Sequence, residues 1–464
     1  MTPLRSLAKV GLLVAVVFGT SAVRAAPTGT LTVDGPRAVA VDGRIELVAE
    51  SSSSGGSWAW LLVPQGARTR PSSLVDDRVR LTARGRHAVI EGLRVSARPD
   101  DVVVRVEHRQ GGIVQRTTVA LTVVTGSATA YRPQHGAGYF PHTRTAVPDD
   151  QEEDPALGPG IRRDGGSDVD PSGEDDLIEV ELASSFAPLD VELRRSSSSL
   201  RVWTTRTRNA GTELTFSGDR SEAISLPPAG TTVWVEWQGA HGTARLDLRP
   251  AGSLGTRGAL DRLRFHTFRS IVLSLGGEDQ VPSVPVDPNH GAFVFGVDLY
   301  ERGYDVHLYD EDNVSSSGSG AVYTEVVNAL QQRGVTEVVS FGYSHGGGST
   351  WDLVDRLDAN RASLPTFSVP YTGYQDGVEN DSDIDLDQER KFPPSSAFHV
   401  NHYQRGSFSD FFLDGGPVSG AFPVTDGLDV ETTPWGAGAT HFLVDDYAEV
   451  LGTMRDFFLP RVSR

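Results

Sequence analysis

The sequence predicts a multidomain protein in which two all-β modules precede an α/β domain with a mostly parallel sheet. Residues 30–250 contain short, alternating apolar runs separated by Gly, Pro, Ser and Asp turns, which is the pattern of antiparallel strands. From residue 258 onwards, apolar runs alternate with amphipathic segments, which is typical of a parallel sheet with crossover helices. The length of 464 residues suits about three domains of ordinary size.

Residues 1–26 have the composition of a secretory signal peptide. Arg5 and Lys9 precede an apolar run at 10–18, and the small residues around Ala26 offer a cleavage site. The run is shorter than the roughly 20 residues that a membrane span requires, and no later segment is apolar enough. We therefore expect a secreted or extracytoplasmic protein without a membrane span.

Composition narrows the function classes further. The chain has no cysteine, so its β modules depend on their cores or on metal ions rather than on disulfides. The net charge of −19 argues against nucleic acid and against anionic membrane surfaces as partners.

The first module is expected at residues 27–125. Its strand-like runs lie at 43–50, 57–63, 79–83, 102–108 and 115–124. Trp58 and Trp60 are placed like the core tryptophan of an immunoglobulin-type sandwich, and the region resembles the Ig-like or PKD-like modules of bacterial secreted proteins. The resemblance implies a spacer, with contact to a cell surface or a polymer as the alternative.

Residues 126–176 are expected to form an acidic linker rich in Gly and Pro, which ends in a candidate calcium loop. Counted from the first residue of that loop, side-chain oxygens fall at positions 1, 3, 5, 9 and 12, and glycine falls at position 6, which is the spacing of a twelve-residue Ca²⁺ loop. The five candidate ligands are Asp168, Asp170, Ser172, Asp176 and Glu179. Position 8 is an aspartate and the sequel is strand-like, so the loop is not an EF-hand. A solvated acidic linker is the alternative.

The second β module is expected at residues 177–252. Runs at 177–182, 200–203, 213–216, 232–237 and 244–248 alternate or nearly so. Trp234 and Trp237 are predicted to point to opposite faces, so one of them is a candidate contact for a polymeric ligand.

The α/β domain is expected at residues 258–464. Strands are predicted at 270–275, 305–309, 335–341, 366–371, 397–402 and 428–432, and helices at 291–302, 320–333, 345–357 and 443–458. That order of elements is the one expected of an α/β-hydrolase.

The central motif of this domain is Gly342-Tyr-Ser-His-Gly346, which follows a β-branched run and opens an amphipathic segment. A strand, a sharp glycine turn and a helix are the setting of a nucleophile elbow, which lifts Ser344 above the sheet edge. The N–H of His345, at the start of the helix, is then aimed where an oxyanion forms. A glycine-rich turn with a surface serine is the alternative interpretation.

A serine nucleophile needs a general base and an acid that orients this base. His441 lies in a glycine-rich loop after the last strand and before the last helix, so it is the predicted base. Asp376 is the predicted acid, because it follows the strand after the elbow, and Asp410 or Asp414 are the alternatives one strand later. The second oxyanion donor is expected from Gly277 or from the residue after it.

Residues 258–464 resemble serine-dependent α/β-hydrolases of the lipase and esterase kind, found in secreted multidomain bacterial proteins. The resemblance rests on Leu275-Gly-Gly277, Gly342-Tyr-Ser-His-Gly346, Tyr374-Gln-Asp376, Asn401-His-Tyr-Gln404 and Thr440-His-Phe442. It implies hydrolysis of an ester-type acyl substrate, small or polymeric, without a catalytic cofactor. The insertion at 377–394 is acidic where such lipases carry an apolar lid, which argues against hydrolysis of fat at an interface. A non-catalytic adhesin or scaffold with a hydrolase-like domain is the alternative function.

Overall fold

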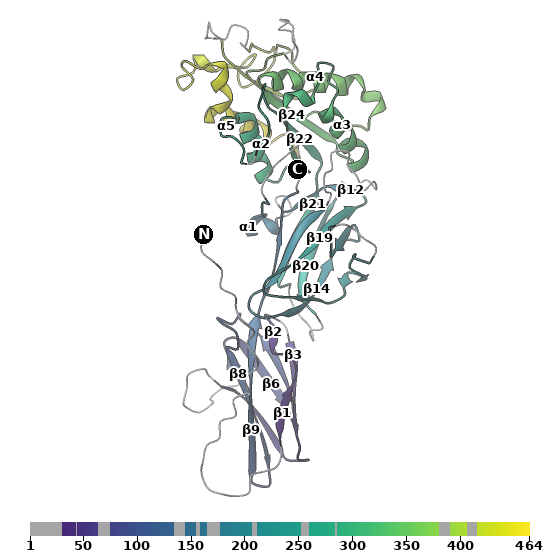
Figure 1. Ribbon diagram of the computed structural model, residues 1–464, viewed down its shortest axis with the longest axis vertical. Coiled ribbons are helices and arrows are strands. Elements are labelled where there is room, and N and C mark those ends of the chain that lie inside the picture. The colour runs from purple at the N-terminus through teal and green to yellow at the C-terminus, as the bar shows by residue number, and fades with distance from the viewer. Residues whose placement is uncertain are drawn as a thin grey trace.

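The structure, a computed structural model, describes residues 30–42, 44–63, 75–133, 144–154, 158–164, 177–206, 211–251, 259–283, 285–379, 390–405 and 415–464. Three units are stacked along one long axis, with the parallel-sheet unit at the far end from the first strands (Figure 1). Several domains with strands first and a six-stranded parallel sheet last were predicted, and this arrangement is confirmed. The expected signal peptide lies outside the described residues.

The first unit consists of two sheets around one core. Its first sheet has the order β1 (Leu31–Asp34), β3 (Arg44–Ser51), β7 (His87–Gly92), β6 (Val79–Arg84) and β5 (Val75–Asp76), and its second has the order β2 (Ala38–Ala40), β9 (Ile113–Val124), β8 (Val102–Gln110) and β4 (Ser57–Val63). Trp60 is buried in the shared core and donates its indole N–H to the Gly85 carbonyl oxygen at 3.0 Å. Trp58, two residues earlier on the same face of β4, is half-buried and packs against the same core.

The second unit is larger than the module expected at 177–252. One sheet contains β10 (Gly126–Ala130), β13 (Ile178–Ser184), β19 (Thr231–Gln238), β12 (Arg163–Asp164) and β15 (Leu200–Trp203). The other contains β11 (Gly160–Ile161), β21 (Asp261–Thr267), β20 (Thr243–Pro250), β14 (Leu189–Arg195), β17 (Arg220–Ser221), β16 (Phe216–Ser217) and β18 (Ile224–Leu226). A one-turn helix, α1 (Asp149–Glu152), precedes β11.

Four strands of this unit lie outside the residues 177–252 expected for the second module. β10, β11 and β12 lie in the expected linker, and β21 lies in the expected α/β domain, yet all four pair with strands of the second unit. β11 and β12 have two residues each and β10 consists of five small residues, so only the pairing with their partners identifies them as strands. Trp237 is buried in the core and Trp234 is half-buried, so neither is a fully exposed polymer contact.

The third unit has six parallel strands in the order β23 (Val306–Tyr309), β22 (Ser270–Leu275), β24 (Glu337–Tyr343), β25 (Thr372–Gln375), β26 (His399–Tyr403) and β27 (Leu428–Asp429). Its long helices are α2 (Gly291–Glu301), α3 (Ala321–Asn328), α4 (His345–Ala359) and α5 (Ala448–Phe458). Short helical segments are η1 (Glu311–Asn313), η2 (Ala329–Arg333), η3 (Arg361–Ser363), η5 (Val430–Thr432) and η6 (His441–Asp446).

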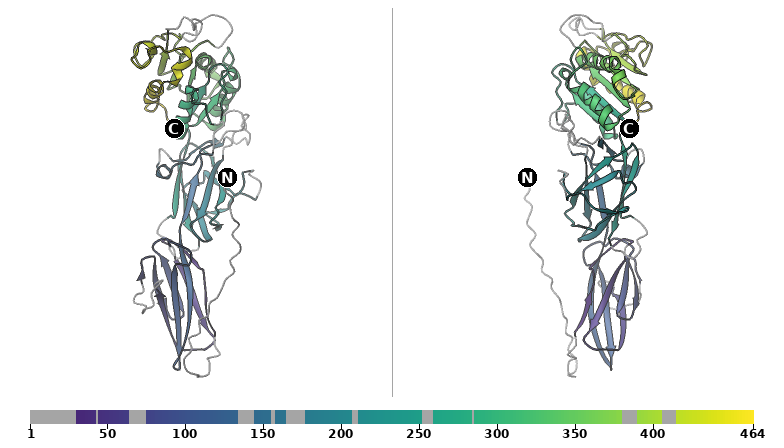
Figure 2. Two further views of the ribbon diagram at one scale, coloured as in Figure 1. Left: turned by 60° about the vertical axis from the view of Figure 1, so that its left-hand side comes forward. Right: turned by 90° about the vertical axis from the view of Figure 1, so that its right-hand side faces the viewer.

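Helices cover both faces of this sheet (Figure 2). α2 and α5 share a core with one face, to which Val272 belongs, and α3 and α4 share a core with the other, to which Ile271 and Leu273 belong. Successive residues of β22 therefore serve opposite cores, and this explains the continuous apolar runs of the buried strands. The strand expected at 366–371 is found at Thr372–Gln375 instead. Pro370 lies within the predicted run, and proline cannot donate a main-chain hydrogen bond to a neighbouring strand.

A buried ion pair joins the second and third units. The Arg162 guanidinium, between β11 and β12, donates to Asp305 Oδ1 at 3.0 and 2.7 Å, and both side chains are 1% exposed. Asp305 immediately precedes β23, so this contact lies at the amino-terminal edge of the parallel sheet.

Candidate active site

Ser344 lies on a strained turn between β24 and α4. Its φ of 53° and ψ of −128° are values that non-glycine residues rarely adopt, at a cost of about 1–3 kcal/mol. Glycine is required on both sides of the turn. A Cβ on Gly342 would lie 2.2 Å from the Gly346 carbonyl oxygen, and a Cβ on Gly346 would lie 2.3 Å from the Gly276 carbonyl oxygen. The motif therefore packs β24, α4 and the end of β22 against one another.

The structure brings Ser344, His441 and Asp376 together. His441 Nε2 lies 2.7 Å from Ser344 Oγ, and His441 Nδ1 lies 2.8 Å from Asp376 Oδ2. Each distance is within ordinary hydrogen-bond range. Ser344 comes from the end of β24, Asp376 from the end of β25 and His441 from the first residue of η6, so all three meet at the carboxyl edge of the sheet.

Asp376 is held by a set of donors that favours its carboxylate form. Oδ1 accepts the main-chain N–H groups of Gln404 at 3.0 Å and Gly415 at 3.1 Å, and Oδ2 accepts Gln404 Nε2 at 3.1 Å as well as His441 Nδ1. Complete burial raises the pKa of the Asp376 carboxyl, and the hydrogen bonds from His441 and Gln404 oppose this shift. Gln404 was part of a sequence motif, but its role as a support of Asp376 appears only in the structure.

Tyr343 fixes the imidazole from the other side. Its hydroxyl donates to the His441 carbonyl oxygen at 3.0 Å, and the two rings stack with their centroids 5.2 Å apart. The residue that precedes the predicted nucleophile thus positions the predicted base.

The two predicted oxyanion donors differ in their surroundings. His345 begins α4, so its N–H is one of the unpaired amides at a helix start, and burial lowers the pKa of its side chain. Gly277 lies against the nucleophile, because a Cβ there would be 2.9 Å from Ser344 Cβ. The Gly277 N–H, however, donates to Gln280 Oε1 at 3.0 Å, so in this structure a side chain occupies the donor that was expected to be available.

The site lies where the strand order reverses. β22 is flanked by β23 on one side and by β24 on the other, so the strand order reverses between β22 and β24. Gly277 follows β22 and Ser344 follows β24. In open parallel sheets ligands bind outside the carboxyl ends of the strands at such a point.

An acidic cluster that sequence reasoning did not single out lies at the same edge. Carboxylate oxygens of Asp310, Glu311 and Asp312 lie within 4.8 Å of one another at the end of β23. Burial and the neighbouring Asp310 raise the pKa of Glu311 to about 9, so this carboxyl holds a proton at neutral pH.

The candidate calcium loop lies mostly outside the described residues, which include only Glu179 of its five predicted ligands. Glu179 lies on β13 and pairs with Arg144 at 2.6 Å, so it is a strand residue with a cationic partner. Asp410 and Asp414, the alternative acids, and residues 380–389 of the acidic insertion are also outside the described residues. Calcium binding stays a prediction.

His399 and His402, which the sequence analysis did not select as the base, are buried on β26, and burial lowers the pKa of each ring to about 3. Both rings are therefore neutral at physiological pH. His399 Nδ1 lies 2.9 Å from Thr372 Oγ1, which gives it a structural role.

Comparison with models of known protein families found no match, and a search of curated proteins found no similar sequence. None of the helices in the described ranges combines the length and apolar character that crossing a membrane requires.

Proposed function

We propose that this protein is a secreted serine hydrolase that cleaves an ester-type acyl substrate through a Ser-His-Asp triad. The observation that carries the proposal is the continuous hydrogen-bond chain from Ser344 Oγ through His441 to Asp376, centred on a strained strand-to-helix turn. A surface serine in a glycine-rich turn has no need of a buried histidine and a buried carboxylate.

The mechanism follows from the positions of the atoms. Ser344 Oγ attacks the substrate carbonyl carbon while His441 Nε2 takes the hydroxyl proton, and Asp376 stabilises the imidazolium that results. The ester C–O bond then breaks, the alcohol leaves with the proton from His441, and the acyl group stays on Ser344. Water, deprotonated by His441, releases the acid and restores the serine.

The oxyanion requires two donors at the moment of attack. The His345 N–H, at the start of α4, is the first. The Gly277 N–H becomes the second when the substrate carbonyl oxygen replaces Gln280 Oε1, the acceptor that it has in this structure. The Gln280 amide therefore marks the position that the substrate oxygen takes.

The surroundings of His441 favour a substrate with an apolar group. Phe442 and Leu443, the next two residues, are 64% and 44% exposed, and the Phe442 ring lies edge-on to the imidazole with centroids 5.7 Å apart. Exposed large apolar side chains beside a buried triad offer contact area to an acyl chain or to an apolar alcohol.

We further propose that the third unit has an α/β-hydrolase fold and that the two β units have Ig-like folds. We also propose that the protein is exported and cleaved near residue 26. The six-stranded parallel sheet and the two-sheet β units support the fold assignments. The mass and the amino-terminal sequence of the protein recovered from culture medium test the cleavage.

Labelling by a fluorophosphonate probe tests the activity, because the probe reacts only with an activated serine. We expect the full chain to be labelled, Ser344→Ala to lose labelling and Ser349→Ala to retain it. Ser349 is a matched control, since it is also buried, on the same helix, with only one long hydrogen bond of 3.5 Å. Absence of labelling in the wild-type chain would instead favour the non-catalytic adhesin or scaffold.

A further inference from the structure

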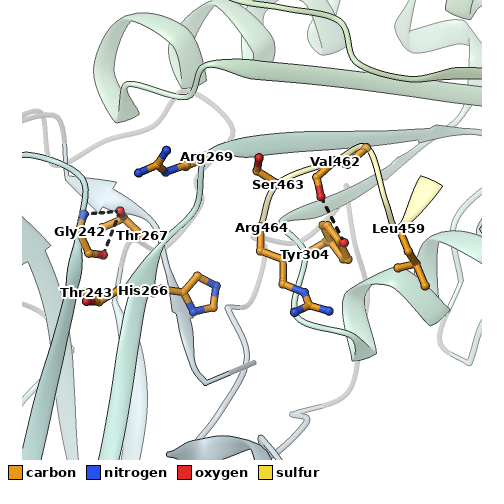
Figure 3. A pocket seen from close by; sticks show the side chains of 10 residues that line it. All are labelled: Gly242, Thr243, His266, Thr267, Arg269, Tyr304, Leu459, Val462, Ser463 and Arg464. Carbon is orange, nitrogen blue, oxygen red and sulfur yellow. Dashed lines mark hydrogen bonds between the residues drawn. The ribbon is translucent and has the colours of Figure 1, made fainter. Parts of the chain in front are cut away.

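A cavity of about 510 Å³ lies between the second and third units, far from the triad. Strands β20 and β21 form one wall, and Tyr304 and the segment 459–464 form the other (Figure 3). Arg269, which lines it, immediately precedes β22, whereas Gly277 follows that strand at the opposite edge. At about 3.3 Å per residue, the length of β22 alone separates the two sites by roughly 20 Å.

The charge of the cavity is opposite to that of the chain. Arg269 and Arg464 line it, and none of its ten lining residues has an acidic side chain, although the chain has a net charge of −19. The main-chain oxygen of Arg464 accepts the Arg269 N–H at 3.1 Å. Glu337, the first residue of β24, accepts the N–H and the hydroxyl of Ser463 at 2.8 Å each, so this carboxylate is already engaged by the wall residue Ser463. An anion that enters therefore meets cations and few competing acids.

His266 supplies the second observation. Its side chain is on β21, the residue is 7% exposed, and neither ring nitrogen has a hydrogen-bond partner among the described residues. Burial, together with Arg464 and Arg132, lowers the pKa of the ring to about 4, so it is a neutral ring with one N–H to donate. Figure 3 shows this ring and the Arg464 guanidinium projecting into the same space. Buried polar groups are nearly always satisfied, and an unsatisfied one calls for a partner that is not part of the chain.

The remaining wall is apolar. The Tyr304 ring, Leu459 and Val462 line the side that belongs to the third unit. The Tyr304 hydroxyl is directed to the Val462 carbonyl oxygen at 3.4 Å, and the Arg464 guanidinium lies over the Tyr304 ring, 5.2 Å from its centroid. A volume of this size is in the range of small-molecule sites and exceeds what an inorganic ion fills.

We propose that this cavity binds a small organic anion, whose carboxylate or phosphate group contacts His266 and Arg464 and whose apolar body lies against Tyr304 and Val462. Because the two walls belong to different units, bound ligand bridges the junction that Arg162 and Asp305 also join. The site is independent of the proposed hydrolase activity.

Titration of the full chain with three probes at constant ionic strength tests the proposal: hexanoate, inorganic phosphate and uncharged 1-hexanol. We expect hexanoate to raise the melting temperature with concentration and to shift the ring resonances of His266 in a ¹⁵N-histidine NMR spectrum. His266→Ala and Arg464→Gln should each weaken binding at least tenfold. Arg245→Gln, which removes an exposed cation from β20 outside the cavity, should not.

The other outcomes are equally definite. Binding of phosphate but not hexanoate, with the same dependence on His266 and Arg464, assigns the site to a phosphate-bearing anion. Equal binding of 1-hexanol, binding that both variants leave unchanged, or no effect of either anion overturns the proposal and leaves ordered water as the partner of His266. Repeating the titration on Ser344→Ala separates this site from hexanoate bound at the triad.

Discussion

Replacing Asp376 by asparagine tests the proposed triad at the carboxylate, whose two oxygens both accept hydrogen bonds from fixed donors. An asparagine side chain has one oxygen and one NH₂ group, so its orientation decides the outcome. In one orientation the NH₂ group takes the place of Oδ1 and faces two main-chain N–H donors, those of Gln404 and Gly415, which cannot turn away. The NH₂ group is therefore forced to the position of Oδ2, beside His441 Nδ1.

That orientation imposes the wrong tautomer on His441. Nδ1 must accept from the asparagine, so Nε2 carries the proton and can no longer take one from Ser344 Oγ. The loss expected for this change is about 10⁴ in kcat, which corresponds to about 5.4 kcal/mol at 1.36 kcal/mol per factor of ten. The fold should survive, because both main-chain donors keep their acceptor and the Gln404 side-chain amide, which donates to Oδ2 in the wild type, can turn its oxygen towards the new NH₂ group.

The assay is hydrolysis of a p-nitrophenyl ester, together with the rate of fluorophosphonate labelling and a melting curve. Asp414→Asn serves as the comparison, because it is one of the alternative acids and should lose little activity. Wild-type kcat in Asp376→Asn would refute the reasoning, and a larger loss in Asp414→Asn would place the acid one strand later. A collapse of the melting temperature in Asp376→Asn would point to a structural carboxylate instead.

Three further outcomes are expected. Arg162→Met leaves the buried Asp305 without its closest cation and should lower the free energy of unfolding by about 3–5 kcal/mol, which a lower melting temperature would show. Arg201→Met breaks a partly exposed ion pair and should lower it by less than about 1 kcal/mol. Burial and a neighbouring carboxylate raise the pKa of Asp445 to about 8. The folded state therefore keeps a proton that the unfolded chain releases near pH 4, so the protein loses stability as the pH rises from about 4 to about 8. Asp445→Asn should therefore gain melting temperature over wild type as pH rises through that window, and a constant difference would contradict the shift. Phe442→Ser should reduce kcat/KM more for octanoyl than for acetyl p-nitrophenyl esters, and an equal effect on both would remove this side chain from substrate contact.

Local sequence determined the features that depend on neighbours along the chain. Gly342 can be recognised from the sequence because it must approach the main chain of Gly346 within the turn itself, whereas Gly346 approaches Gly276, at the end of β22. Buried strands such as β22 and β24 can be recognised from the sequence because helices cover both of their faces. Their sequences are therefore uninterrupted apolar runs. The order of elements was enough to select Ser344, Asp376 and His441 from the chain.

Only the tertiary structure decided what depends on pairing between distant segments. β10 and β21 carry no signal that assigns them to the second unit, because strand membership is a property of the partner as much as of the strand. The hydrogen bond from the Gly277 N–H to Gln280, and the supports that Gln404 and Gly415 give to Asp376, depend on loop geometry that no periodicity encodes. The cavity at His266 could not be predicted from the sequence either, because its two walls come from distant segments that belong to two different units.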